Sequence, residues 1–287
     1  MAIRILTDST ADFTKEEAHA LGLTVIPLNV NFGPDEVYRD GEDLDLQEFY
    51  ERLEHAEKLP TTSQPSPELF LAAFEEAKEA GEPVVAVLLS GALSGTLQSA
   101  RLAAEMSGYE DQIFLVDSMT VTLAEQLLVR RAVALRDQGF TAAEIARTLD
   151  EEKKRIRLYA VVDTLKYLQK GGRLSAAVAV AGTLLGIKPV ITVQNGKVGV
   201  VGKARGLPGA YVTIFKLISA EEGGIDILRP YLLGYTGHRR TVEPFYRYIC
   251  DNLHLPKPPV SAIGPVIGVH AGPGACGIAY FAAEKED

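Results

Sequence analysis

The sequence predicts an α/β protein with two domains, and three observations support this prediction. Strand and helix patterns alternate through residues 1–155, as expected for a parallel sheet with helices on both faces. In residues 156–287 a hairpin signal, Asn195-Gly196, breaks the alternation and indicates a mixed sheet. The length of 287 residues suits two domains of ordinary size. We therefore expect an N-terminal parallel α/β/α domain over 1–155 and a C-terminal mixed-sheet α/β domain over 156–287.

The helices of the first half begin at recognisable signals. Thr14 with Glu17 forms a capping box, and the same pattern recurs at residues 141–144. Ser66 before Pro67 is an N-cap followed by proline at the first helical position. The expected strands are 3–6, 24–30, 84–89 and 113–116, and the expected helices are 14–21, 45–54, 66–80, one from about 95, 121–138 and 141–155.

The second half contains more strands than helices. Asn195-Gly196 lies between two alternating runs, and a type I′ turn requires positive φ at both of its central residues. This signal fixes a hairpin of strands 190–194 and 197–201. The other expected strands are 157–162, 231–235, 260–270 and 277–282, and the expected helices are 175–185, 208–220 and 242–253.

Composition excludes several classes of protein. The net charge of −9 argues against binding nucleic acid, which requires clustered lysine and arginine. Cys250 and Cys276 are the only cysteines and no CxxC occurs, so neither a disulfide framework nor a metal site is expected. The N-terminus lacks signal-peptide features, and no apolar run reaches the roughly 20 residues that cross a bilayer. We expect a cytoplasmic protein without a cofactor.

Two hydroxyl-rich segments precede helices and are candidate oxygen-binding loops. Residues 90–96 (SGALSGT) follow a buried strand, at the edge where open α/β sheets bind ligands. Ser94 and the Gly95 amide, at a helix start, suit an anionic oxygen. Thr62, in the segment 61–66 (TTSQPS), offers a further hydroxyl. The alternative is that both segments only cap helices and make turns. Neither carries a cation, which favours a single carboxylate over a polyphosphate.

Three other segments combine glycine with a basic or imidazole side chain. Arg173 lies in KGGRLS (170–175), either an anion-binding loop or a plain turn. Arg205 lies in GKARG (202–206), which we expect to be an exposed loop. His270 begins HAGPG at the end of an expected strand, and is either a ligand contact or a satisfied strand-end histidine.

Sharper catalytic motifs are absent from the sequence. There is no GxxxxGK[ST] phosphate-binding loop and no HExxH, and Ser94 is not part of a GxSxG nucleophile elbow. Asp8, Asp117 and Asp163 each follow an expected strand, but their spacing matches no metal-binding pattern. We expect these three carboxylates to accept hydrogen bonds.

The order and spacing of these short segments resemble those of the DegV family of bacterial lipid-binding proteins, over essentially the whole chain. Each segment is weakly specific alone, and the combination is highly specific. The matching segments are Thr7 to Thr10, Thr62 to Ser66, Leu93 to Thr96, Asp117-Ser118, Lys170 to Arg173, Lys188-Pro189, Arg205-Gly206, Ile263 to Pro265 and His270 to Gly274.

The resemblance implies a two-domain DegV-like fold that buries a long-chain fatty acid. It implies that Thr62 and Ser94 hold the carboxylate, with the Gly95 amide adding a bond and His270 nearby. The protein is then a carrier subunit rather than an enzyme. Some family members present the acid to a separate fatty-acid kinase, which makes the acyl phosphate. Arg173 and Arg205 match arginines implicated in docking that kinase or assisting phosphoryl transfer.

The chain departs from the family pattern at positions that shape the acyl tunnel. Ala271 stands where many members have threonine, and Leu123 and Ala124 stand where members often have glycine. The preferred chain length is therefore open. The apolar segment 175–185 is either a buried core helix or a lid over the acyl chain that touches a membrane surface transiently.

Three other functions remain in competition at this point. The two-domain plan also resembles the substrate-binding half of dihydroxyacetone kinases, in which a histidine captures a ketone, and His270 would then be a nucleophile. A lipid hydrolase using Ser94 is a weaker rival, because no general base is evident from spacing. A regulatory adaptor that binds lipid as a structural ligand is the third.

Overall fold

The computed structural model describes residues 2–174, 186–221, 223–253 and 255–284. The strands of its first sheet lie in the order β2 (Leu23–Ile26), β1 (Arg4–Asp8), β6 (Val84–Leu88) and β7 (Ile113–Asp117). All three pairings are parallel, as the alternating pattern predicted. Every residue of β6 is buried, because helices cover both faces of this sheet, and a continuous apolar run is therefore required there.

The second sheet is mixed, also as predicted. Its strands lie in the order β10 (Lys197–Arg205), β9 (Ile187–Gln194), β8 (Ile156–Val161), β13 (Cys276–Phe281), β11 (Leu232–Tyr235) and β12 (Val260–Ala262). All neighbours are antiparallel except β11 and β12. The turn between β9 and β10 has φ of 51° at Asn195 and 74° at Gly196, which confirms the hairpin.

A third, antiparallel sheet was not predicted. Its strands lie in the order β4 (Glu36–Arg39), β3 (Asn29–Gly33) and β5 (Thr61–Ser63). The single strand predicted over 24–30 is wrong: β2 ends at Ile26, because Pro27 has no amide to continue the ladder. The chain then leaves the parallel sheet and β3 pairs with β4. Thr62 therefore lies on a short strand opposite Val30 and not on a loop.

Most predicted helices are present within a few residues. Both capping boxes form, at Thr14 with Glu17 and at Thr141 with Glu144. The helices are α1 (Lys15–Leu21), α2 (Leu46–His55), α3 (Pro67–Ala80), α4 (Thr96–Ser107), α5 (Leu123–Asp137), α6 (Ala142–Glu152), α7 (Lys166–Lys170), α8 (Gly206–Ala220), α9 (Glu243–Leu253) and α10 (Pro265–Ala271).

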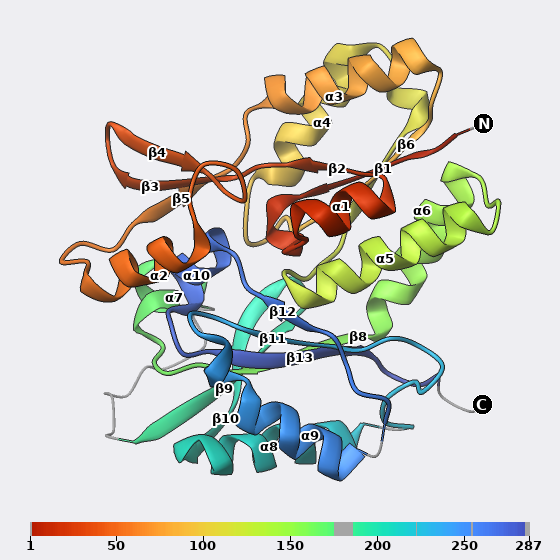
Figure 1. Ribbon diagram of the computed structural model, residues 1–287. Helices are drawn as coiled ribbons and strands as arrows, with labels where there is room; N and C mark the ends of the chain where they lie inside the picture. Colours follow the sequence, from red (N-terminus) through yellow and green to blue (C-terminus); the bar gives the residue numbers. More distant parts are fainter. Residues whose placement is uncertain (1, 175–185, 222, 254, 285–287) are drawn as a thin grey trace.

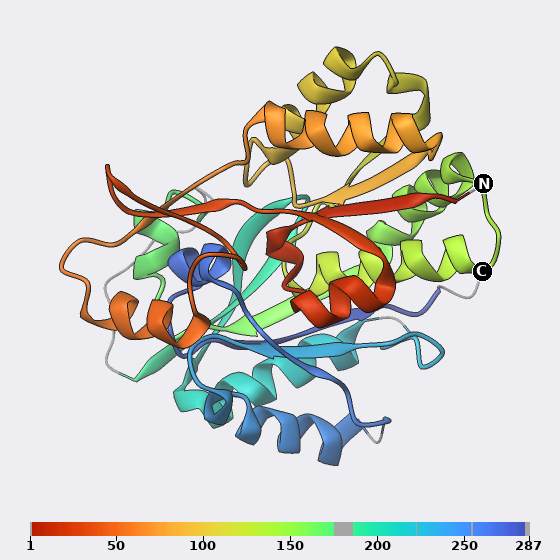
Figure 2. The same cartoon turned by 45° about the horizontal axis from the view of Figure 1, so that its top comes forward.

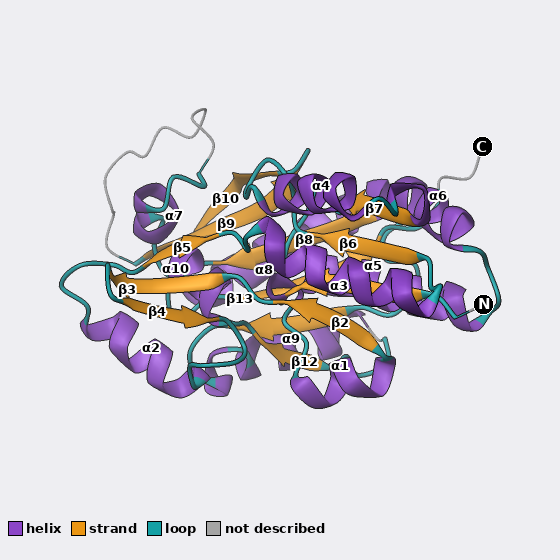
Figure 3. Cartoon of the chain, turned by 90° about the horizontal axis from the view of Figure 1, so that it is seen from above, coloured by secondary structure: helices purple, strands orange, loops and turns teal. Residues whose placement is uncertain are grey.

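The elements stack in layers (Figure 1). Helices α3 and α4 cover the outer face of the parallel sheet, and α1, α5 and α6 lie between the parallel and mixed sheets. Helices α8 and α9 cover the other face of the mixed sheet. Viewed from above, β3 and β4 extend beyond one end of the parallel sheet (Figure 3). The turned view places α2 beside α10 at that same end (Figure 2), in agreement with their contacts.

The strand predicted over 260–270 is wrong. Only β12 is extended, and α10 follows it. Gly264 is the N-cap of α10 and Pro265 occupies its first turn, where the fixed φ of proline suits a helix and its missing amide is not needed. His270 consequently lies in the last turn of a helix and not at the end of a strand.

Two further sequence predictions have different outcomes. The loop predicted at 202–206 is largely strand, because Gly202 to Arg205 pair with β9 as the end of β10. Lys203 and Arg205 are exposed on this edge strand, where charges are typical. The helix predicted at 175–185 lies outside the described residues. The domain boundary at 155/156 stays a prediction.

Helix α5 packs against strands of both sheets. One hydrophobic core accordingly joins Ile5 and Val85 of the parallel sheet, Leu127 of α5, and Leu232 and Phe281 of the mixed sheet. Both large sheets therefore depend on the same helix for the burial of their facing sides.

The first turn of α5 also buries an acid, Glu125, which has no exposed surface. The Thr10 hydroxyl lies 2.6 Å from Asp8 Oδ1 and 2.9 Å from Glu125 Oε2. A hydroxyl has one proton and cannot donate to both. Asp8 also accepts bonds from the Leu89 and Thr10 amides, so we assign the ionised form to Asp8 and the proton to Glu125. Burial, with the nearby charge of Asp8, raises the pKa of Glu125 well above its ordinary value.

We predict that Glu125→Gln preserves this network, because glutamine keeps one acceptor and one donor and carries no charge. The raised pKa means that the native state of the natural protein loses stability as pH rises above the ordinary glutamate value. The variant should therefore match the natural protein near pH 4.5 and unfold at higher temperature at pH 8. Glu105→Gln, at an exposed site, is the control. A variant equally destabilised at both pH values would contradict the protonated assignment.

Candidate functional site

A cavity of about 490 Å³ lies between the mixed sheet, the start of α5 and helix α10. Its volume is in the range of small-molecule sites. Aliphatic side chains from both halves of the chain line it, including Leu123, Leu158, Ile191 and Ile263. Arg173 is the one lysine, arginine, aspartate or glutamate among the described residues that line it. The cavity therefore suits a long apolar molecule with one small polar group.

Thr62 and His270 meet at the polar end of the cavity. Thr62 Oγ1 and His270 Nε2 are 2.9 Å apart, joining β5 to the last turn of α10. Burial, and secondarily the charge of Arg173, lowers the pKa of His270 to about 4. The ring is therefore neutral at pH 7. Its buried Nδ1 has no hydrogen-bond partner in the described part of the chain.

Gly171 makes room for the imidazole. A Cβ at this position would lie 2.2 Å from His270 Nδ1, although the φ of −75° would itself tolerate any residue. The first glycine of KGGR thus permits close approach of the backbone to His270.

Ser94 and Gly95 lie at the start of α4, with Gly95 as its N-cap. The Ser94 hydroxyl is 2.9 Å from Thr96 Oγ1 and accepts a bond from the Thr96 amide at 3.3 Å. Gln64 lies over Gly95, where a Cβ would be only 1.9 Å from Gln64 Oε1. The Gln64 amide donates to Ser99 Oγ at 3.0 Å. Segment 61–66 is therefore fastened to α4 directly across the polar end of the cavity.

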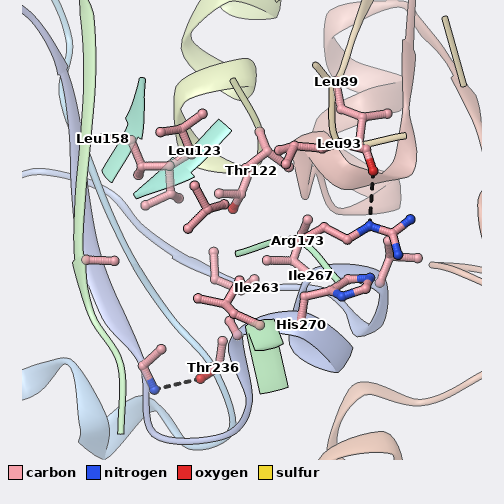
Figure 4. Close-up of a pocket in the computed structure, with 18 of the residues that line it drawn as sticks. Leu89, Leu93, Thr122, Leu123, Leu158, Arg173, Thr236, Ile263, Ile267 and His270 are labelled. Atoms are coloured by element: carbon pink, nitrogen blue, oxygen red, sulfur yellow. Dashed lines mark hydrogen bonds between the residues drawn. The ribbon is translucent and has the colours of Figure 1, made fainter. Parts of the chain in front are cut away.

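Arg173 is oriented by backbone carbonyl groups. Its Nε donates to the Leu93 carbonyl at 3.1 Å and its Nη1 to the Gly171 carbonyl at 2.7 Å. Figure 4 shows the guanidinium close to His270, with the bond to Leu93 dashed. The side chain thus brings positive charge to the polar end without a carboxylate partner in the described part of the chain.

The other end of the cavity is apolar. Leu123 and Leu158 lie on the side of the close-up away from Arg173 and His270 (Figure 4). Leu123 and Ile263 pack onto the backbone of Gly234, where a Cβ would be 2.9 Å from both. This contact closes the space between α5 and β11.

Five of the six residues singled out from sequence line this one cavity: Thr62, Ser94, Gly95, Arg173 and His270. Arg205 is outside the cavity, exposed at the end of β10. Sequence reasoning assigned no role to Gln64, and it missed Ile267 because α10 was predicted as strand. The Gly264-Pro265 pair was the available signal for that helix.

The hydrogen bonds of Ser94 and His270 bear on the lipid hydrolase and the ketone-capturing enzyme considered from the sequence. The hydrogen-bond partner of the Ser94 hydroxyl is Thr96, and His270 Nε2 bonds to Thr62. Within the described ranges, no three His, Cys, Asp or Glu side chains are grouped to hold a metal ion. Among the helices of those ranges, none has the length and apolar character needed to cross a membrane.

Comparisons of sequence give one consistent family. Residues 2–283 match the family model described as "Uncharacterised protein, DegV family". A DegV domain-containing protein of Deinococcus radiodurans is 38% identical over 282 residues, covering 97% of this chain and 98% of the relative. Protein DegV of Bacillus subtilis is 35% identical over 285 residues, covering 98% of this chain and 99% of the relative.

Solved structures share the whole fold. A fatty-acid-binding DegV family protein from Thermus thermophilus aligns with a TM-score of 0.88 at 32% identity, covering 99% of this chain and 100% of that one. A stearic acid-binding protein from Eubacterium ventriosum gives 0.88 at 28% identity, covering 98% of each chain. DegV from Bacillus subtilis, a fatty acid binding protein, gives 0.82 at 32% identity, covering 99% and 100%.

We predict that Gly171→Ala displaces the His270 ring and breaks its bond to Thr62. The new methyl group overlaps Nδ1, so the variant should lose about 1–3 kcal/mol of unfolding free energy, as overpacked sites do. Thermal unfolding measures the loss. Gly199→Ala is the control, because no atom lies within 4 Å of its Cβ position, and it should remain within about 0.5 kcal/mol of the natural protein. Equal melting of all three proteins would show that His270 is not confined as described.

Proposed function

The chain belongs to the DegV family, and we propose that it binds a long-chain fatty acid in the cavity described above. The carboxylate lies at the polar end, between Thr62, Ser94, the Gly95 amide and His270, and the acyl chain follows the aliphatic wall. The observation that carries this proposal is the composition of the cavity: one end has hydroxyls, an amide, a neutral imidazole and the Arg173 guanidinium, and most of the remaining wall is aliphatic. The fatty-acid-binding structures with the same fold support it.

The apolar wall accounts for most of the affinity. A 16-carbon acid has about 14 methylenes, and burying each contributes roughly 0.8 kcal/mol, or about 11 kcal/mol in all. Association and ordering of the chain cost several of these. The acyl chain therefore supplies most of the favourable binding free energy, and a strong ion pair at the head group is not required.

The polar end supplies orientation and selectivity. A carboxylate leaves water at high cost unless it is hydrogen-bonded. Thr62, Ser94 and the Gly95 amide are donors that meet this need, and the charge of Arg173 lies close by. An ester presents no anionic oxygen to these groups, so we expect free acids to be preferred over esterified lipids.

We further propose that the loaded protein acts as a carrier and presents the acid to a separate fatty-acid kinase. The sequence has no phosphate-binding loop of its own, so the nucleotide would be supplied by the partner. Arg205 is exposed on an edge strand and is accessible to another protein. Arg173 lies at the carboxylate end, where it would offset the negative charge developing on an acyl phosphate.

The test is native mass spectrometry of the purified protein, followed by denaturation and identification of what is released. We expect one free fatty acid per chain. The double variant Thr62→Ala/Ser94→Ala should release little or none, because each lost hydrogen bond to the carboxylate costs roughly tenfold in affinity. Thr61→Ala is the control, since Thr61 is on the same strand but does not line the cavity. A protein that is empty and takes up no added fatty acid would refute the proposal, and a covalent adduct on His270 would favour the ketone-capturing enzyme.

The far end of the cavity yields a prediction about chain length. Leu123→Ala removes the side chain that packs onto Gly234, which should lengthen the space for the acyl tail. The bound acids should shift to longer chains, by about two or three carbons. Leu135→Ala, also buried on α5 but outside the cavity, controls for general loss of packing. An unchanged chain-length profile would place the tail elsewhere.

A further inference from the structure

Helix α10 is tied at both ends to the first 62 residues of the chain. At its start the Gly264 amide donates to Asp12 Oδ1 at 2.8 Å. At its end His270 bonds to Thr62 at 2.9 Å. Between these ties Val266 and Ile267 line the cavity. At 1.5 Å per residue the helix is only about 10 Å long, so a displacement at its start is transmitted to His270.

We propose that Asp12 and Asp40 are positioning residues of the carboxylate-binding site, acting through α10 on His270, and that loss of a proton at Asp40 weakens fatty-acid binding. The proposal rests on the proposed function and adds a pH-linked control of the same site.

Both carboxyl groups converge on the start of α10. The position of a Cβ on Gly264 would be 2.8 Å from Asp12 Oδ1, and 3.4 and 3.7 Å from the two oxygens of Asp40. Asp12 accepts bonds from the Thr122 hydroxyl at 2.5 Å and from the Gly264 amide. Asp40 lies beside the Ser9 hydroxyl and the Val266 amide in the first turn of α10, and both neighbours favour its charged form. Asp12 therefore holds one backbone amide of the helix start, and Asp40 packs against the same turn.

The carboxyl oxygens of Asp40 are less completely hydrogen-bonded than those of Asp12. It is only 4% exposed, and its Oδ1 has no hydrogen-bond partner in the described chain. The ionisable groups around it are Asp8 at the end of β1, Asp12, and Tyr50 of α2. Among the described residues no lysine or arginine pairs with these acids. The adjacent Arg39 is exposed and pairs with Glu42 and Asp43 instead.

This environment makes the charge of Asp40 sensitive to pH near neutrality. Burial, and secondarily the charge of Asp8, raises its pKa from 3.8 to about 7. In an opened arrangement, in which the start of α10 is displaced and water reaches Asp40, the pKa of Asp40 returns to its ordinary 3.8. Between about pH 4 and pH 7 the closed arrangement holds a proton that the opened one lacks, so rising pH favours opening, and the effect levels off above pH 7.

Protonation of His270 gives the closed arrangement the opposite pH dependence over part of the range from pH 4 to pH 7. Because its pKa is lowered to about 4, the closed arrangement is weakened as pH falls from about 6.5 towards 4. Below about pH 6.5, ionisation of Asp40 and protonation of His270 change with pH in opposite directions. Between about pH 6.5 and pH 7, only Asp40 contributes. Removing the Asp40 charge therefore separates them.

The test compares Asp40→Asn, Asp40→Ala and the natural protein, with Asp43→Asn as control. Asp43 is near in sequence and exposed, and its carboxylate bonds to Arg39. Binding of the fluorescent acid 11-(dansylamino)undecanoic acid is titrated at pH 5, 6, 7 and 8, below the melting temperature of every variant. Ionisation of the probe is common to all four proteins, so the ratio of dissociation constants isolates Asp40.

We expect Asp40→Asn, which keeps the acceptor but not the charge, to gain affinity relative to the natural protein as pH rises from 5 to 7, by about tenfold. Asp40→Ala, which lacks the acceptor, should bind about tenfold more weakly than Asp40→Asn at every pH. Asp43→Asn should follow the natural protein. A profile of Asp40→Asn parallel to that of the natural protein would overturn the pH linkage.

A second measurement needs no ligand. The pKa of His270, followed by NMR of the imidazole, should rise from about 4 towards its ordinary 6.5 in Asp40→Ala, because a displaced ring regains water. Asp40→Asn should restore the low value. A natural protein that binds no fatty acid would refute the proposed function, while an unmoved His270 in a folded Asp40→Ala would refute the positioning role alone.

Discussion

The arrangement depends on one packing constraint: α5 fills the space between two sheets. Leu127 and its neighbours on this helix contact strands of the parallel and of the mixed sheet in one continuous core. The cavity lies where α5 begins, since Thr122 and Leu123 form part of its wall. Thr122 itself has φ of 55° and ψ of −130°, an uncommon conformation for a β-branched residue that marks the sharp entry into the helix. The same element that joins the sheets therefore also limits the space available for a ligand.

Electrostatics divides the interior into two regions. Asp8, Glu125 and Asp40 are buried behind the cavity without a cation among the described residues, and hydrogen bonding and protonation compensate their burial. The cavity itself contains one formal charge, that of Arg173, which two backbone carbonyls orient. In the proposed function an anionic head group meets donors and a cation at one end, while Asp8 and Glu125 bond to threonine hydroxyls and Asp8 also to backbone amides. Helix α10 links the two regions because its start contacts the acids and its end carries His270.

The sequence was sufficient for those features that local chemistry determines. Capping boxes, the Asn195-Gly196 turn and continuous apolar strands depend on residues close in the chain, and all are present. The sheet of β3, β4 and β5 was missed because it depends on a change of partner after Pro27, which no periodicity records. The strand predicted at 260–270 failed because apolar content outweighed the helix-start signal of Gly264-Pro265. Contacts such as Gln64 over Gly95 or Gly171 against His270 join residues distant in sequence, and only the fold reveals them.

The chemistry of the polar end also bears on why its groups are largely neutral. A carrier must release its ligand or expose the carboxylate to a partner, and a buried bidentate arginine clamp would oppose both, since breaking a buried ion pair leaves a charge uncompensated. Here the guanidinium of Arg173 already donates to the Leu93 and Gly171 carbonyls, so its contribution to the head group is shared. Hydroxyls and a neutral imidazole can exchange a carboxylate for water at smaller cost. In the proposed function, affinity resides in the acyl chain and orientation in the head group, and this division would allow tight storage together with transfer of the acid.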